Sequence, residues 1–267
     1  MPYFVDTNLC SKVLKDPSLQ KQWGNAKRQF ARDGHQYVIC PLVLLELLKG
    51  LAKPEPEFFN SDLQRLSFLA GSGPRQFLEL PGAFVLKTVL GSPSPVARFS
   101  SADFDQWLKV TLNADTRDAL VQGRVALYQS RFMSFGLDLN SIKRMDDKGL
   151  QFHIDNWETR RANKTPPPTR NQWAAVLLYS QGIIFQPADL PKLATALDAA
   201  YQYDLAIYKV MPRYNFRSDR NAGDRTDSEL LFYLSDADMH IVTGDARFKN
   251  RVASSSQVSR IHLLSEF

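Results

Sequence analysis

Two neighbouring segments near the C-terminus decide the fold: Asp224-Arg-Thr-Asp-Ser-Glu-Leu-Leu-Phe-Tyr-Leu234 and Asp238-Met-His-Ile-Val-Thr-Gly-Asp245. Thr226 and, three residues later, Glu229 form a capping-box pattern, which predicts that a helix starts there. The leucines that follow supply the apolar stripe of this helix. The short apolar run of Met239, Ile241 and Val242 is typical of a strand buried in a parallel sheet. The two segments therefore predict a helix, a loop and a strand.

Two carboxylates stand at the ends of this unit. Asp227 lies at the predicted helix start, and Asp245 falls just past the strand, where α/β sheets place their ligands. They are 18 residues apart, which is what a helix, a turn and a strand need to bring two carboxylates to one edge. Such an edge attracts a hard cation.

The first 50 residues repeat the strand-and-helix alternation. Tyr3–Val5 is a short strand that ends at Asp6, and a helix whose N-terminus is marked by Asp16 and Pro17 follows. Tyr37–Cys40 is a second strand, and Pro41 starts a helix that ends near Gly50. This order predicts parallel strands joined by helical crossovers.

The middle of the chain has mostly helical periodicity, and the alternating pattern resumes only at Asp224 and closes with a strand at Arg260–Leu264. We therefore predict an α/β fold with a central parallel sheet flanked by helices. Residues 1–53 and 212–267 form its domain, and 54–211 are a mostly helical insertion, with packing on the same core left open. Helical periodicity is plainest in Phe104–Leu112, Thr116–Phe132 and Leu190–Val210, whereas Phe84–Leu90 suits strand or helix.

Composition limits the class of protein. The chain has 267 residues, of which 44% are hydrophobic and 23% charged, as in ordinary globular proteins. Its net charge of +5 permits a nucleic-acid partner without requiring one. Cys10 and Cys40 adjoin apolar runs, which favours buried thiols over a disulfide framework. The N-terminus lacks the pattern of a signal peptide, and no apolar run approaches a membrane span, so we expect a cytoplasmic protein without a membrane partner.

Four acids occupy positions that suit a site, although each has an ordinary structural explanation. Asp6, Asp227 and Asp245 could be helix N-caps or first-turn acids favoured by the helix dipole. Glu46 shares a helical face with Lys49, which would make it half of an exposed ion pair. Glu46 is also a charge within a leucine-rich run, and a carboxylate partly buried there needs a partner or a metal.

Taken together, these motifs resemble the PIN-domain family of metal-dependent nucleases. The resemblance rests on Val5-Asp6-Thr-Asn8, on Glu46 in its helix, on Asp227, and on Ile241-Val-Thr-Gly-Asp-Ala-Arg-Phe248. It covers roughly residues 1–53 and 221–267. The long segment between them has no counterpart in the compact members of that family, which affects the substrate class more than the chemistry.

The resemblance implies a site for one or two Mg²⁺ or Mn²⁺ ions, held by Asp6, Glu46, Asp227 and Asp245 as the catalytic and metal-binding residues. Asp224 is a candidate fifth carboxylate, with helix capping as an equal alternative. Asn8 and Thr243 would be supporting polar groups. Phosphodiester hydrolysis suits such a site, since divalent cations held by carboxylates activate water and neutralise phosphate. The four histidines show no ligand spacing, which argues against a zinc hydrolase.

An acidic centre that cleaves a polyanion needs basic residues around it. Arginines precede and enter the acidic stretch, two aromatic residues among them offer faces for unpaired bases, and three more basic residues follow Asp245. We predict RNA as the substrate, because the resemblance favours it and single strands suit recognition by stacking. The predicted substrate-binding residues are Arg213, Tyr214, Phe216, Arg217, Arg220 and Arg225.

The sequence thus predicts a metal-dependent endoribonuclease. A non-catalytic RNA- or protein-binding module with the same fold is the alternative, as is an interaction protein whose acids only cap helices. Whether an inhibitor protein or a second copy of the chain binds this protein is left open.

Overall fold

A four-stranded parallel sheet lies at the centre of the protein, whose structure is a computed structural model. The structure describes residues 1–51, 56–71, 75–91, 101–120, 154–180, 184–210, 214–215 and 223–267, with residues 148 and 151. The strand order is β2-β1-β3-β4, and all neighbours are parallel. The strands are β1 (Pro2–Val5), β2 (Gln36–Tyr37), β3 (His240–Thr243) and β4 (Ile261–Leu263). The predicted α/β class with a parallel sheet flanked by helices is confirmed.

The sheet register places the ends of β1 and β3 side by side. Val5 is the partner of Val242, and both strands end within one residue of this pair. Parallel strands present their carboxyl ends at the same edge of a sheet. The residues that follow β1 and β3 therefore start from neighbouring points on that edge.

The first two helices begin at aspartates that cap them. Asp6 caps α1 (Thr7–Lys15) by accepting a hydrogen bond from the backbone N–H of Leu9, and Asp16 caps α2 (Pro17–Arg32). Pro17 occupies the first turn of α2, where its missing N–H costs nothing. The helices α3 (Pro41–Gly50) and α4 (Pro56–Ala70) follow and pack against each other.

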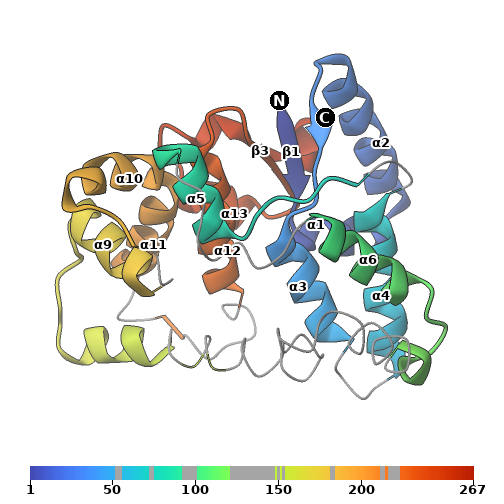
Figure 1. The fold of residues 1–267 in the computed structure, drawn as a ribbon, viewed down its shortest axis with the longest axis horizontal. Helices are drawn as coiled ribbons and strands as arrows, with labels where there is room; N and C mark the ends of the chain where they lie inside the picture. Colours follow the sequence, from blue (N-terminus) through green and yellow to red (C-terminus); the bar gives the residue numbers. More distant parts are fainter. Residues whose placement is uncertain are drawn as a thin grey trace.

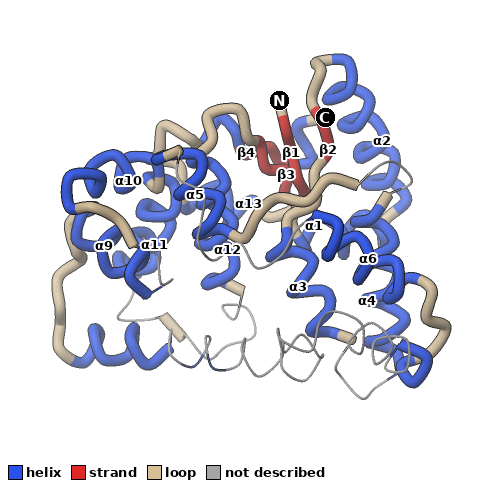
Figure 2. The backbone as a smooth tube through the Cα atoms, in the orientation of Figure 1, coloured by secondary structure: helices blue, strands red, loops and turns tan. Residues whose placement is uncertain are grey.

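Helices surround the sheet in two groups (Figure 1). To the right in this view lie α2, α3 and α4, joined by α6 (Ser101–Leu112). To the left lie α5 (Pro81–Leu90), α9 (Arg170–Ser180), α10 (Leu190–Ala196), α11 (Asp198–Val210) and α12 (Asp224–Leu230). Figure 2 shows the strands between the two groups. After α12 the chain continues through the short helix η4 (Leu231–Ser235) into β3. The helix α13 (Ala246–Arg251), the strand β4 and the short helix η6 (Leu264–Glu266) then follow in that order.

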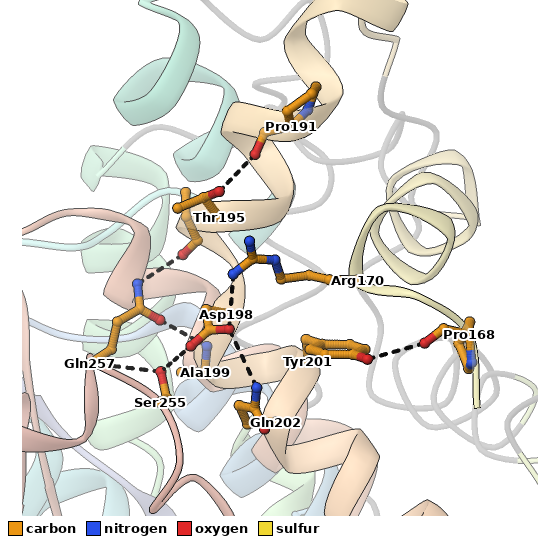
Figure 3. Close-up of polar contacts among 11 residues, drawn as sticks. Pro168, Arg170, Pro191, Thr195, Asp198, Ala199, Tyr201, Gln202, Ser255 and Gln257 are labelled. Carbon is orange, nitrogen blue, oxygen red and sulfur yellow. Dashed lines mark hydrogen bonds and ion pairs between the residues drawn. The ribbon is translucent and has the colours of Figure 1, made fainter.

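Two helices of the long middle segment, α10 and α11, pack on the residues that flank β3 in the sequence. Gln257 is buried, and its side-chain amide donates to the carbonyl oxygens of Ala196 and Leu234, each at 3.0 Å. Its amide oxygen accepts from the backbone N–H of Ala199 at 2.8 Å. Beside it, Asp198 accepts from Ser255 at 2.7 Å, as Figure 3 shows. These bonds fix the start of α11 against the C-terminal part of the chain.

Three local predictions are corrected. The predicted strand Tyr37–Cys40 forms a ladder only at Gln36–Tyr37, because Ile39 pairs instead with Phe77. The helix α12 begins at Asp224, not at Thr226. Its N-cap residue is Gly223, which has no side chain to donate or accept, so the predicted capping box does not form at this terminus.

The middle segment also differs in detail from its periodicity. Leu190–Val210 is divided into α10 and α11, with Leu197 between them. Phe84–Leu90, which suited strand or helix, is helical, and its helix ends at Gly91 with a φ of 66° that glycine adopts readily. Of the predicted helix Thr116–Phe132, residues 121–132 lie outside the described residues. Cys10 and Cys40 are free and buried, as predicted.

Candidate functional site

Asp6 and Asp245 lie at the carboxyl edge of the sheet. Asp6 follows β1 directly and caps α1, while Asp245 follows β3 by two residues and caps α13 by accepting from the N–H of Arg247 at 2.8 Å. Each strand thus ends in an acid that starts the next helix. Because β1 and β3 are neighbours, the two acids approach each other.

Thr243 joins these two positions. It is fully buried, and its hydroxyl donates to Oδ2 of Asp6 at 2.5 Å while accepting from the backbone N–H of Asp245 at 2.9 Å. Thr243 therefore contacts both Asp6 and Asp245 directly. Asn8, the other residue predicted to support the acids, is exposed on α1 and makes no hydrogen bond to them in the described part of the chain.

Asp6 is a buried carboxylate beside other negative charges. It is only 2% exposed, and burial raises its pKa to about 6. The hydrogen bonds from Thr243 and Leu9 oppose this rise in the pKa, whereas the charges of Glu46 and Asp245 add to it. Both of these acids thus lie within electrostatic reach of Asp6.

Glu46 reaches the same region from α3. Its Oε2 accepts from the hydroxyl of Thr7 at 2.5 Å. Thr7 directly follows Asp6, so this bond ties α3 to the end of β1. Sequence analysis does not single out the role of Thr7, although it lies between Asp6 and Asn8 in the first motif. The side chain of Lys49, the alternative partner of Glu46, lies outside the described side chains.

Asp227 approaches from the first turn of α12. Burial raises its pKa well above the usual value, and the negative charges of Asp6, Glu46 and Asp224 raise it further. Its Oδ2 accepts from the hydroxyl of Tyr203 at 2.9 Å, which lowers the pKa in part. The four acids singled out in the sequence are therefore brought into one electrostatic group.

Asp224 has a different environment from the other acids. It is 2% exposed, and its Oδ1 accepts from Arg251 at 2.7 Å, from Tyr203 at 3.1 Å and from Arg247 at 3.3 Å. It begins α12 but does not cap it, so the capping alternative is wrong. Two arginines compensate its charge, while its Oδ2 is buried without a hydrogen-bond partner among the described residues.

These residues suit a hard divalent cation by donor type and by charge. Carboxylate oxygens are the ligands that Mg²⁺ and Mn²⁺ prefer, and a cation would relieve the repulsion that raises the pKa values of Asp6 and Asp227. The side chains are not drawn into one ligand shell, however: within the described residues, no group of three or more His, Cys, Asp or Glu side chains has the arrangement of a metal site.

The predicted substrate-binding residues fall into two sets. Arg213, Phe216, Arg217 and Arg220 lie outside the described residues. Arg225 forms an ion pair with Glu229 at 3.2 Å within α12. Tyr214 is only 8% exposed, and its hydroxyl accepts from Arg251 at 3.3 Å, so it does not present an open face to a base.

The basic groups that the structure places at this edge come from other positions. Arg247 and Arg251 on α13 reach Asp224, and Lys12 on α1 donates to the carbonyl oxygen of Gly244, which precedes Asp245. The basic run after Asp245 is visible in the sequence. The pairing of these arginines with Asp224 depends on how α12 and α13 pack and has no local signal.

Three histidines meet around His240, the first residue of β3, although they are far apart in the sequence. Nδ1 of His240 lies 2.8 Å from Nε2 of His262, and the ring centroids of His35 and His240 are 4.8 Å apart. Burial, together with the neighbouring histidines, lowers the pKa of His240 to about 4. Burial also lowers the pKa of His262. This proximity has no counterpart in the spacing of the histidines along the sequence.

Comparison with models of known protein families, with curated proteins and with solved structures finds no match for this chain. Within the described residues, every helix is too short or too polar to cross a membrane.

Proposed function

We propose that this protein is a Mg²⁺- or Mn²⁺-dependent endoribonuclease with a PIN-like site. One observation carries the proposal: Glu46, Asp227 and Asp245 come from three separate elements, and each lies within electrostatic reach of Asp6 at the end of β1. The pKa values of Asp6 and Asp227 are raised in part by the charges of the other acids, which supports their mutual proximity. A role in helix capping alone does not explain why these four acids are close enough to affect one another's pKa values.

The residues of the chain have distinct roles in this proposal. Asp6 and Asp227, whose pKa values burial raises, hold the cation, and Glu46 and Asp245 complete its carboxylate surroundings. Thr243 and Thr7 orient Asp6 and Glu46 through their hydroxyl groups. When bound, a divalent cation supplies an activated water and neutralises the phosphate that is attacked.

The substrate is RNA in this proposal, and the basic residues near the acids attract its phosphates. Lys12 lies beside Gly244 at the acidic edge, while Arg213, Arg217 and Arg220 precede α12 in the sequence. Neutralisation of phosphates by such residues makes binding dependent on salt. Arg251 and Arg247 already have Asp224 as a partner, so they stabilise the site itself.

A non-catalytic RNA- or protein-binding module is the second candidate. The observation that favours it is that Asp6 and Asp245 each have a complete structural role as helix caps. Under this alternative the acids would tolerate replacement by asparagine, which caps helices about as well as aspartate.

Incubation of the purified protein with mixed single-stranded and structured RNAs, with Mn²⁺ or with EDTA, tests the proposal. We expect cleavage only with Mn²⁺, at internal positions that mapping of the cut ends identifies. The variant Asp6→Asn serves as the matched control for a contaminating nuclease. RNA that is retained but uncut under both conditions would favour the binding module instead.

A further inference from the structure

Tyr203 is a buried residue that the proposed function does not yet use. It lies on α11, within the long middle segment, and its side chain is 0% exposed. Its hydroxyl oxygen is 2.9 Å from Oδ2 of Asp227 and 3.1 Å from Oδ1 of Asp224. Arg251 donates to the same hydroxyl oxygen at 2.7 Å. A tyrosine from outside the PIN-like motifs thus connects two acids and an arginine.

The hydroxyl can act only as a donor toward the acids. A phenol ordinarily has a pKa of about 10, so the hydroxyl of Tyr203 keeps its proton at neutral pH. A phenol has one proton to donate, and Arg251 occupies one of the lone pairs of its oxygen. The proton is therefore directed at one of the two carboxylates, Asp224 or Asp227.

The two carboxylates need this proton to different degrees. Asp224 has Arg251 and Arg247 as charged partners. For Asp227, the hydrogen bond found in the described part of the chain comes from Tyr203. A carboxylate held by one donor depends on that donor for its orientation, because the loss of the donor frees its side-chain torsions.

Tyr203 itself is held firmly. The guanidinium of Arg251 lies 4.9 Å from the centre of its ring, and the ring of Phe248 packs against it with centroids 5.8 Å apart. On the next residue of α11, the buried Asp204 accepts from the indole N–H of Trp173 at 2.8 Å, which ties α11 to α9. The phenol is thus a fixed point against which a carboxylate can be oriented.

We propose that Tyr203 is a positioning residue that orients the Asp227 carboxylate toward a divalent cation, so that α11 completes the acidic site. This inference rests on the proposed function, since it concerns the same site. It also gives the middle segment a role in that site, because α11 supplies a group that the segments resembling a PIN domain do not contain.

Titration of the full-length protein with Mn²⁺ by calorimetry tests this inference, with Tyr203→Phe compared to Tyr233→Phe. Both variants lose only a hydroxyl from a fully buried tyrosine, but that of Tyr233 donates to the backbone carbonyl of Glu79, away from the acids. We expect Tyr203→Phe to bind Mn²⁺ about 10- to 100-fold more weakly, the range for loss of an outer partner of a metal ligand. Tyr233→Phe should bind Mn²⁺ like the wild type.

Cleavage kinetics add a readout that a merely structural role does not change. At fixed low Mn²⁺, kcat of Tyr203→Phe should fall while KM for RNA stays the same, and saturating Mn²⁺ should restore kcat. In the Asp227→Asn background, the Tyr203→Phe change should have no further effect on Mn²⁺ binding, because the residue acts through Asp227. If Tyr203→Phe does not fold, Arg251→Lys removes the guanidinium donor to the phenol and should weaken Mn²⁺ binding in the same direction.

The outcomes separate the role of Tyr203 from the proposed function. A wild type that binds Mn²⁺ and a Tyr203→Phe variant that binds it equally well would overturn the role of Tyr203 and leave the proposed function standing. Additive effects of Tyr203→Phe and Asp227→Asn would overturn it as well. A wild type that neither binds Mn²⁺ nor cleaves RNA would overturn the proposed function and this inference with it.

Discussion

Titratable side chains lie close together at both ends of the sheet, but the two groups differ in whether their members are charged at neutral pH. At the amino end, His35, His240 and His262 lie together, and the lowered pKa values of the last two keep them neutral near pH 7. At the carboxyl end, the pKa of Asp6 is raised only to about 6, so at neutral pH it carries charge beside other acids. At neutral pH, His240 and His262 therefore carry no charges that repel each other. The acids at the carboxyl end do repel one another, and a cation would relieve that repulsion.

The opposite pKa shifts have opposite consequences for stability. Asp6 binds its proton more tightly in the folded state than in the unfolded state, so its contribution to stability is lost as pH rises from about 4 to about 6. His240 binds its proton less tightly in the folded state, so stability is lost as pH falls from about 6.5 to about 4. The contribution of each end to stability can thus be distinguished, because the two contributions change in opposite directions as pH rises.

The largest expected effect is on cleavage. We expect Asp6→Asn to lower kcat by more than about 100-fold, beyond the effect expected for a residue outside the metal shell, while its circular dichroism stays native. The matched control is Asp62→Asn, which also replaces a buried acid, but one that forms an ion pair with Arg65 on α4. If Asp6→Asn cleaved RNA at the wild-type rate, the acids at the carboxyl end of the sheet would not be the catalytic site.

The next effect is on stability at alkaline pH. Without metal at pH 8, we expect Asp6→Asn to be more stable than the wild type by up to about 3 kcal/mol, since asparagine has no charge to bury and still caps α1. The gain should disappear at pH 3, where both folded and unfolded Asp6 are protonated. Urea unfolding in EDTA at the two pH values measures it. An equal gain at both values would mean that charge is not the cause.

The smallest effect concerns the histidines. Replacing His240 by Asn keeps a polar group near His262 but removes a base that the fold holds neutral. We expect the wild type to lose about 1 kcal/mol between pH 6.5 and 4.5 relative to His240→Asn, after allowance for solvent at this partly exposed position. Melting temperatures across this range measure the difference, and parallel curves for the two proteins would contradict it.

The features of the two ends that depend on local sequence could be predicted. The strands that end at Asp6 and before Asp245 are short apolar runs, and the Asp16-Pro17 start of α2 follows from cap and first-turn preferences. Their parallel order follows from the alternation of strands and helices. The carboxyl edge with its acids could therefore be predicted before the structure.

What could not be predicted depends on packing between distant segments. Tyr203 reaches Asp227 only because α11 docks through Gln257 and Asp198, and nothing near Tyr203 in the sequence marks it. The start of α12 moves to Asp224, the residue that Arg251 and Tyr203 hold, against the local capping signal. The histidines meet because β3 and β4 pair, which residue spacing does not reveal.

The central claim is that the acids at the carboxyl end repel one another until a divalent cation binds them, and melting curves test it most directly. We expect the wild type to melt roughly 5–10 °C higher in Mn²⁺ at about 100 times its Kd than in EDTA. Asp227→Asn should melt higher than the wild type in EDTA, because one buried charge is gone, and should gain less from Mn²⁺. A wild type whose melting temperature is the same in EDTA and in saturating Mn²⁺ would contradict the account and the proposed nuclease function.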